Sequence, residues 1–345
     1  MASLGGSGKW PLVAVCPDPT AAPCTADGGD TGALSLNASV NPDWYNANAV
    51  FVGYCDGGSF AGHLDAPLPA GPNGTLLYLR GRLILDALLE DLRPRMAGAL
   101  DVVIKGCSAG GLATYIHAAR LSAFGWSIPG VQRVAVLPGA GAFLDIASYP
   151  GPNIVRPFFA AWSTLHNVSG SLDPECLAQP PEPGKRFLCV FPQYFLARLI
   201  ESVPLFVSNS LVDWSQQSWV MNLGCDLLNP AQACNSSQLA YVNHFRQTMI
   251  QALSPVLRGA ARQHGDESQL SSRCGAFLAT CSIHIIVDND GAWSGIRVQG
   301  QTQLDTFRAW FTNSTTAKTA VVDGLWDSNP TCKLYLFPSW ALGPP

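Results

Sequence analysis

The chain has 345 residues, of which 48% are hydrophobic and 13% are charged, so it can bury one large core as a single domain over residues 1–345. A formal charge of -4, a pI near 5.8 and the lack of any Lys/Arg cluster exclude a basic surface for nucleic acid. No run is long and apolar enough to span a bilayer, and we expect a monomer.

Eleven cysteines are many for a cytosolic enzyme, and their spacings do not match a zinc site. Disulfides are the better interpretation, with Cys107 expected to stay free. Five glycosylation sequons also favour a secreted, extracellular or cell-wall protein; they begin at Asn37, Asn73, Asn167, Asn235 and Asn313. The segment 1–11 does not resemble a signal peptide, so either the leader is missing from this sequence or the protein is not secreted.

Short apolar, β-branched runs that end in glycine or small polar residues predict buried parallel strands. They cover residues 50–54, 102–106, 134–137 and 205–209. Leucines at helical spacing predict a helix over 79–93 that stops at Pro94, and a second apolar face predicts a helix over 112–121. This alternation predicts an α/β fold of the α/β-hydrolase type, with a mostly parallel sheet covered by helices on both faces.

Two segments interrupt the alternation. Residues 163–185 are rich in Pro, Gly and Ser, which predicts an excursion outside the sheet within an insertion at about 150–200. A helical pattern resumes over 194–201, and a longer one over 235–261 predicts a helical cap element at about 225–265.

Ser108 is the candidate nucleophile, in a Gly-x-Ser-x-Gly segment formed with Gly106 and Gly110. Such a serine matters chemically when a strand precedes it and a helix follows, because the tight turn between them lifts its hydroxyl clear of the sheet. Both flanks are present here: the strand predicted over 102–106 precedes the serine, and a helical pattern begins just after Gly110, so that its N-terminus supplies partial positive charge where an oxyanion forms. The alternative is a glycine-rich turn in which the serine only caps the helix.

The serine needs a histidine to accept its proton. His284 follows an apolar run near the C-terminus, where the last member of an α/β-hydrolase triad falls. His117 and His244 lie in helical patterns, His166 adjoins a sequon that favours exposure, and His264 lies in a polar stretch. The alternative for His284 is a core histidine bonded to a backbone carbonyl.

The histidine in turn needs a carboxylate. Asp213 follows the strand predicted at 205–209 and fits best, with Asp145 as the main competitor; Asp288 and Asp290 come too late in the chain. The alternative role for Asp213 is to cap a helix that starts at Trp214.

With these positions the chain resembles the pectin acetylesterase family, which also contains the animal lipid-deacylating protein Notum. The resemblance runs from about 41 to 332 and is carried by several blocks in the same order. These are the segments 54–62 (YCDGGSFAG), 80–82 (RGR), 106–114 (GCSAGGLAT), 209–213 and 281–284.

The resemblance implies a Ser-Asp-His triad at Ser108, Asp213 and His284, and a disulfide between Cys176 and Cys189. In the acidic segment, Trp214 stands one place earlier than the family's tryptophan. The family's glycine-rich oxyanion loop has its nearest match at Gly5 and Gly6, with no strand predicted before them, so we expect the first strands to be missing. The amide of Ala109 is the other expected oxyanion donor.

We therefore predict a serine carboxylesterase that removes O-acyl groups, with acetyl esters of a polysaccharide such as pectin as the first choice. An acylated protein, deacylated as by Notum, is the alternative substrate. A noncatalytic glycan- or lipid-binding relative is the alternative of a different class. No metal or organic cofactor is expected. Aromatic residues that could line either a sugar cleft or an acyl tunnel, or simply belong to the core, are Trp126, Phe158, Phe159, Trp162 and Trp293.

Overall fold

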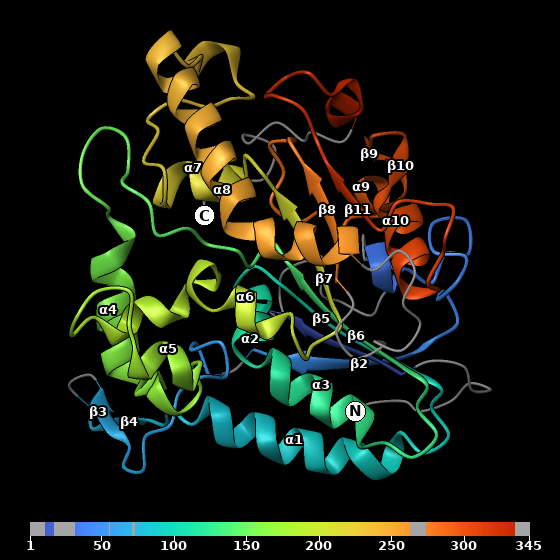
Figure 1. Ribbon diagram of the computed structural model, residues 1–345. Coiled ribbons are helices and arrows are strands. Elements are labelled where there is room, and N and C mark those ends of the chain that lie inside the picture. Colours follow the sequence, from blue (N-terminus) through green and yellow to red (C-terminus); the bar gives the residue numbers. More distant parts are fainter. Residues whose placement is uncertain (1–10, 17–31, 55, 71–72, 263–273, 335–345) are drawn as a thin grey trace.

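The computed structural model describes residues 11–16, 32–54, 56–70, 73–262 and 274–334, and its centre is a seven-stranded sheet (Figure 1). The strand order is β11-β8-β7-β6-β5-β1-β2, and each neighbouring pair is parallel. The strands are β1 (Pro11–Cys16), β2 (Asn48–Gly53), β5 (Asp101–Cys107), β6 (Arg133–Gly139), β7 (Leu205–Ser210), β8 (Cys274–Ala279) and β11 (Ala320–Val322). All four predicted strands belong to this sheet.

Side chains alternate across the sheet and meet a different set of helices on each face. Val102 and Ile104 of β5 pack with Leu85 and Leu89 of α1 (Gly81–Arg95) and with residues of α3 (Ala118–Trp126). Val103, on the opposite face, belongs to a core shared with α9 (Asp290–Gly295) and α10 (Gln303–Phe311). Helices on both faces of a parallel sheet are the α/β-hydrolase-like arrangement that the sequence predicts.

The segment between β6 and β7 contains helices only, within the region expected as an insertion. They are α4 (Val155–His166), α5 (Pro174–Ala178) and α6 (Leu196–Leu199). Figure 1 shows α4 and α5 to one side of the sheet. The remaining elements are α2 (Ala109–Ile116), α7 (Trp214–Trp219) and two small hairpins, β3 (Leu68–Ala70) with β4 (Thr75–Leu77) and β9 (Arg297–Val298) with β10 (Gln301–Thr302).

The long helix α8 (Ser236–Arg262) corrects the expectation of a cap at about 225–265. Its apolar residues Val242, Phe245 and Met249 lie in one core with Leu205 and Val207 of β7. Figure 1 shows α8 lying across β8. The helix therefore covers the sheet, as α1 and α3 do farther along the same face.

Three other expectations also need correction. Helix α1 continues through Pro94 to Arg95, and the amide of Met96 still bonds the carbonyl of Leu92. The helix predicted over 112–121 is two helices, α2 and α3, which meet at His117. Strand β1 was not predicted at all, although it lies between β2 and β5, so the sheet is not short of that strand.

Candidate active site

Ser108 stands between the end of β5 and the start of α2, in a turn that few residues could form. Its φ of 56° and ψ of -120° are unusual for a residue with a side chain, and such strain concentrates at functional sites. Its amide donates to the carbonyl oxygen of Gly139 at 2.9 Å. A Cβ on Gly106 would lie 2.1 Å from the carbonyl oxygen of Gly110, so this turn closes only with glycine at position 106.

His284 and Asp213 reach Ser108 from the loops after β8 and β7. The Nε2 atom of His284 lies 2.7 Å from Ser108 Oγ, and its Nδ1 atom lies 2.7 Å from Asp213 Oδ2. Asp213 is fully buried and His284 is 7% exposed. The structure thus brings the three residues that the sequence singles out into one hydrogen-bonded chain, although Ser108 and His284 are 176 residues apart in the sequence.

Asp213 also caps a helix, which is the alternative role that the sequence offers for it. It is the N-cap of α7, and its Oδ1 atom accepts hydrogen bonds from the amides of Ser215 at 2.8 Å and Gln216 at 3.4 Å. One oxygen of the carboxylate holds the helix and the other holds the imidazole. The start of α7 therefore fixes the rotamer of the group that orients His284.

A network of bonds joins the β7 and β8 loops behind this chain. Gln217 Nε2 donates to Ser282 Oγ at 2.7 Å and to the carbonyl of Val212 at 2.9 Å. A disulfide joins Cys281, three residues before His284, to Cys332. Sequence reasoning assigned neither feature, because Ser282 is 65 residues from Gln217 and Cys332 is 51 residues from Cys281 in the chain.

Residues 25–333 match the family model described as PAE, pectinacetylesterase. The chain belongs to the pectinacetylesterase family. It is 31% identical to pectin acetylesterase 5 of Arabidopsis thaliana over 314 residues, which cover 87% of this chain and 67% of that protein. Pectin acetylesterase 4 of the same plant is 30% identical, with 87% and 70% covered.

Animal relatives are more distant. The palmitoleoyl-protein carboxylesterase NOTUM of Mus musculus is 25% identical over 256 residues, which are 65% of this chain and 49% of that protein. The solved structure of the Wnt deacylase Notum from Drosophila matches with a TM-score of 0.70 at 21% identity, covering 94% of this chain and 90% of that one. This likeness shows a common fold.

In this member of the pectinacetylesterase family, the segment 56–60 after β2 braces the nucleophile turn. Ser59 Oγ donates to the carbonyl oxygen of Ala109 at 3.0 Å, and both Ser59 and Phe60 have φ near +50°. The carboxylate of Asp56 is buried, and burial raises its pKa. The sequence marked this segment only through the family resemblance, and its contact with α2 explains its place near the site.

Of the three expected oxyanion donors, the structure describes only Ala109. Ala109 is the first residue of α2, where a helix leaves its amide without an intrahelical acceptor. Gly5 and Gly6 lie outside the described residues. Gly110 is in the first turn of α2, where its carbonyl accepts a hydrogen bond from Thr114 Oγ1 at 2.8 Å.

The competing acids have other partners. Asp145 forms an ion pair with Arg156 and accepts a hydrogen bond from Tyr194 Oη, each at 2.6 Å. Asp288 pairs with the buried Lys105 of β5. Asp290 accepts from the amide of Gly32 at 2.7 Å.

Among the described residues, no histidine other than His284 bonds Ser108. His117 is buried at the junction of α2 and α3, and burial lowers its pKa to about 3, so it is neutral. His166 is buried as well, contrary to the exposure that its sequon favours, although Asn167 itself is exposed. His264 lies outside the described residues.

The cysteines of the described core include three disulfides. The pair that the resemblance implies, Cys176–Cys189, is present, together with Cys225–Cys234 and Cys281–Cys332. Cys107 is a buried thiol, and burial raises its pKa to about 12, so it does not compete with Ser108 as a nucleophile. In the described cluster of Cys281, Asp323 and Cys332, both sulfurs are in a disulfide, which leaves a metal ion no thiolate there.

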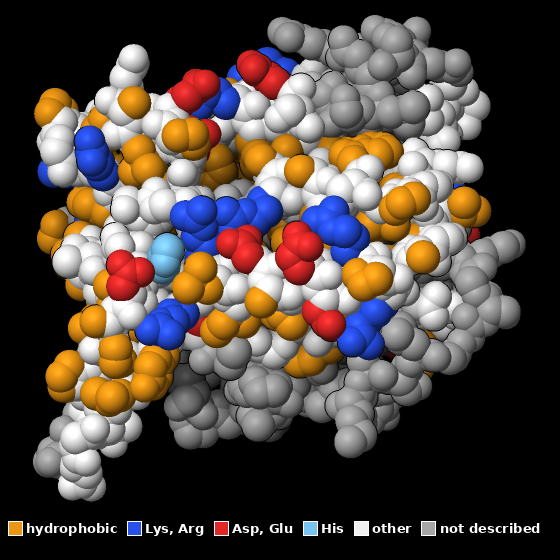
Figure 2. Space-filling model, turned by 90° about the horizontal axis from the view of Figure 1, so that it is seen from below, with side chains coloured by type: hydrophobic (Ala, Val, Ile, Leu, Met, Phe, Trp, Pro, Cys, Tyr) orange, Lys and Arg blue, Asp and Glu red, His pale blue; other side chains and the backbone are white. Residues whose placement is uncertain are grey.

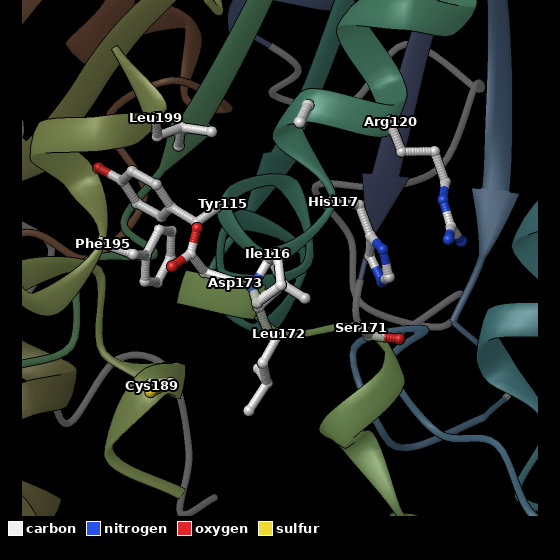
Figure 3. Close-up of a pocket in the computed structure, with 12 residues that line it drawn as sticks. Tyr115, Ile116, His117, Arg120, Ser171, Leu172, Asp173, Cys189, Phe195 and Leu199 are labelled. Carbon is white, nitrogen blue, oxygen red and sulfur yellow. The ribbon is translucent and has the colours of Figure 1, made fainter. Parts of the chain in front are cut away.

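A cavity of about 180 Å³ lies at the other end of α2 from Ser108 (Figure 3). Tyr115, His117, Leu172 and Phe195 contribute to its wall. Figure 2 shows that basic and acidic side chains are interspersed on the face seen from below. Within the described chain, no helix combines the length and apolar character needed to cross a membrane.

Proposed function

We propose that this protein is a serine carboxylesterase that removes acetyl groups from an extracellular polysaccharide such as pectin. The observation that carries the proposal is the hydrogen-bonded chain Ser108–His284–Asp213, at the carboxyl edge of a parallel sheet. A hydroxyl next to an imidazole, which in turn is held by a buried carboxylate, is the arrangement that activates a serine. The two plant relatives named above are pectin acetylesterases, which supports the choice of substrate.

In the first half of the proposed reaction, Ser108 Oγ attacks the ester carbonyl and its proton passes to His284 Nε2. The tetrahedral intermediate collapses as His284 returns this proton to the departing sugar alcohol, leaving an acetyl group on Ser108. Asp213 holds Nδ1 protonated, so that Nε2 is the atom free to accept. The amide of Ala109 is the proposed donor to the oxyanion, at the positive end of α2.

In the second half, water attacks the acetyl-enzyme and gives its proton to His284. Acetate then leaves as Ser108 Oγ takes that proton back, which regenerates the starting state. The side chains of this chain supply each proton transfer. This chemistry needs no electron acceptor or carrier.

The site of action that we propose is outside the cell. Three disulfides join the described residues, and disulfides persist in oxidising compartments. The sequons at Asn37, Asn73, Asn167, Asn235 and Asn313 support the same location.

The decisive experiment compares hydrolysis of p-nitrophenyl acetate by the purified protein and by Ser108→Ala. We expect the variant to lose about 1000-fold or more in kcat. Equal rates for the two proteins would overturn the assignment of Ser108 and favour the noncatalytic alternative.

A second candidate function is deacylation of a lipidated protein, favoured by the similarity to NOTUM of Mus musculus. Comparing p-nitrophenyl acetate with the octanoate ester separates the two. A strong preference for octanoate would favour the deacylase, whereas a preference for acetate supports the polysaccharide esterase.

A further inference from the structure

Trp214 occupies an unusual position for a tryptophan. It is the first residue of α7, directly after Asp213, and it is 43% exposed. Its neighbours in the site are withdrawn from solvent, because Asp213 is fully buried and His284 nearly so. A large apolar side chain at the rim of a buried polar site is the kind of surface that a ligand covers.

The indole ring is held against the histidine of the site. The ring centroids of Trp214 and His284 are 6.0 Å apart, and the ring planes are inclined by 74°. An edge-to-face contact of this kind fixes the indole relative to the imidazole without covering the whole indole. Because His284 Nε2 bonds Ser108 Oγ, a group that lies on Trp214 is also placed beside Ser108.

The second tryptophan of α7, Trp219, packs against other aromatic side chains and so differs from Trp214. Trp219, at the other end of the helix, contacts the rings of Phe143 at 5.0 Å, Phe159 at 6.2 Å and Phe158 at 6.4 Å. Trp214 has no such ring cluster around it in the described structure, apart from His284. The helix therefore uses one tryptophan for the core and presents the other at the site.

We propose that Trp214 is the platform on which a pyranose ring of the substrate polysaccharide stacks, so that an acetyl ester on this or a neighbouring sugar is presented to Ser108. This inference rests on the esterase function proposed above. An acetyl group is too small to supply much binding energy, so the sugar must be bound at the rim.

The chemistry of the ring favours a sugar over a long acyl chain. A flat aromatic face packs against the apolar C–H face of a pyranose ring and tolerates variation in the hydroxyl groups around it. An acyl chain instead needs an enclosed apolar channel. The aromatic side chains of Phe143, Phe159 and Trp219 pack on one another, and the described cavity of about 180 Å³ lies at the far end of α2.

The kinetic test compares three substrates in three variants. We expect Trp214→Ala to raise KM for acetylated oligogalacturonides by about tenfold, the effect of losing an aromatic anchor, and Trp214→Phe to retain most of the affinity. The loss in kcat/KM should be about tenfold larger on the oligosaccharide than on p-nitrophenyl acetate. Tyr78→Ala is the matched control, because Tyr78 is an exposed aromatic residue directly after β4, and Figure 1 shows β4 well apart from α7.

Two kinetic results would overturn the proposal. Equal losses on the oligosaccharide and on p-nitrophenyl acetate would mean that Trp214 only supports His284. A selective loss on p-nitrophenyl octanoate would mean that an acyl chain covers the ring instead of a sugar. Urea unfolding of each variant establishes that the fold is intact.

Binding without turnover separates this proposal from the esterase proposal. Calorimetric titration of oligogalacturonide into Ser108→Ala, and into the double variant with Trp214→Ala, measures the platform in a protein that cannot turn over the ester. We expect about tenfold weaker binding in the double variant. Equal binding by the single and double variants would overturn the platform, even if Ser108 proves to be the nucleophile. Weaker binding by the double variant would support the platform, even if Ser108 proves not to be the nucleophile.

Discussion

Replacing Asp213 with asparagine should stop catalysis while leaving the protein folded, because the two oxygens of this carboxylate have separate roles. Oδ1 accepts from the amides of Ser215 and Gln216, and an asparagine oxygen can keep those bonds. Oδ2 lies 2.7 Å from His284 Nδ1, where the amide NH₂ group would stand instead. Facing a donor, His284 must place its proton on Nε2, and it can no longer accept the proton of Ser108.

The wrong tautomer is expected to lower kcat by about 10,000-fold, which corresponds to about 5.5 kcal/mol of activation free energy. The free energy of unfolding should change by less than about 1 kcal/mol in Asp213→Asn. Asp213→Ala should lose the same activity and, in addition, about 1–3 kcal/mol of stability, since the helix cap is removed and buried donors are left unpaired.

Steady-state hydrolysis of p-nitrophenyl acetate and urea unfolding measure the two effects separately. Asp145→Asn is the matched control: its carboxylate is buried and bound by Arg156 and Tyr194, so the variant should lose roughly 2 kcal/mol of stability but keep its kcat. An Asp213→Asn enzyme with kcat near that of the wild type would refute the assignment of the acid. So would an Asp145→Asn enzyme that is folded and inactive.

Two further predictions concern stability. Burial lowers the pKa of His117 to about 3, so between pH 6.5 and 3 the unfolded chain binds a proton at this residue that the folded protein does not bind. On acidification through this range, His117 should therefore reduce the free energy of unfolding by about 1.4 kcal/mol per pH unit. Urea unfolding at several pH values should show a shallower loss for His117→Gln, and identical slopes would contradict the argument. Replacing Cys281 and Cys332 with alanine opens a loop of 51 residues, which should cost about 4 kcal/mol of stability and lower kcat. Replacing Cys225 and Cys234, whose disulfide spans 9 residues, should cost about 2.5 kcal/mol of stability and leave kcat unchanged. A larger loss of stability for this pair than for Cys281 and Cys332 would count against the argument.

The sheet and the three residues of the hydrogen-bonded chain could be foreseen because their signals are local. Buried parallel strands are short β-branched runs, and the order serine, acid, histidine limits the choice once Ser108 is chosen. Asp213 both bonds His284 and caps α7, a combination that no sequence pattern could show. A single carboxylate has two oxygens, and only the fold decides where each of them points.

The errors came from features that depend on tertiary contacts. The apolar face of α8 predicts a buried side but not what buries it, so a cap and a sheet-covering helix look alike in the sequence. Pro94 lies in the last turn of α1, where few backbone bonds remain to be lost. Strand β1 opens on Pro11, which weakens the strand signal although proline is tolerated at a first strand position.

The disulfide between Cys281 and Cys332 ties the segment carrying His284 to the end of the described chain. Protein made in a reducing cytosol would lack this bond, and its histidine loop would be released from that anchor even where the sheet had folded. An inactive preparation from such a host would therefore report on the oxidation state of the protein, and preparations for kinetic work should come from an oxidising compartment and be checked for the Cys281–Cys332 bond.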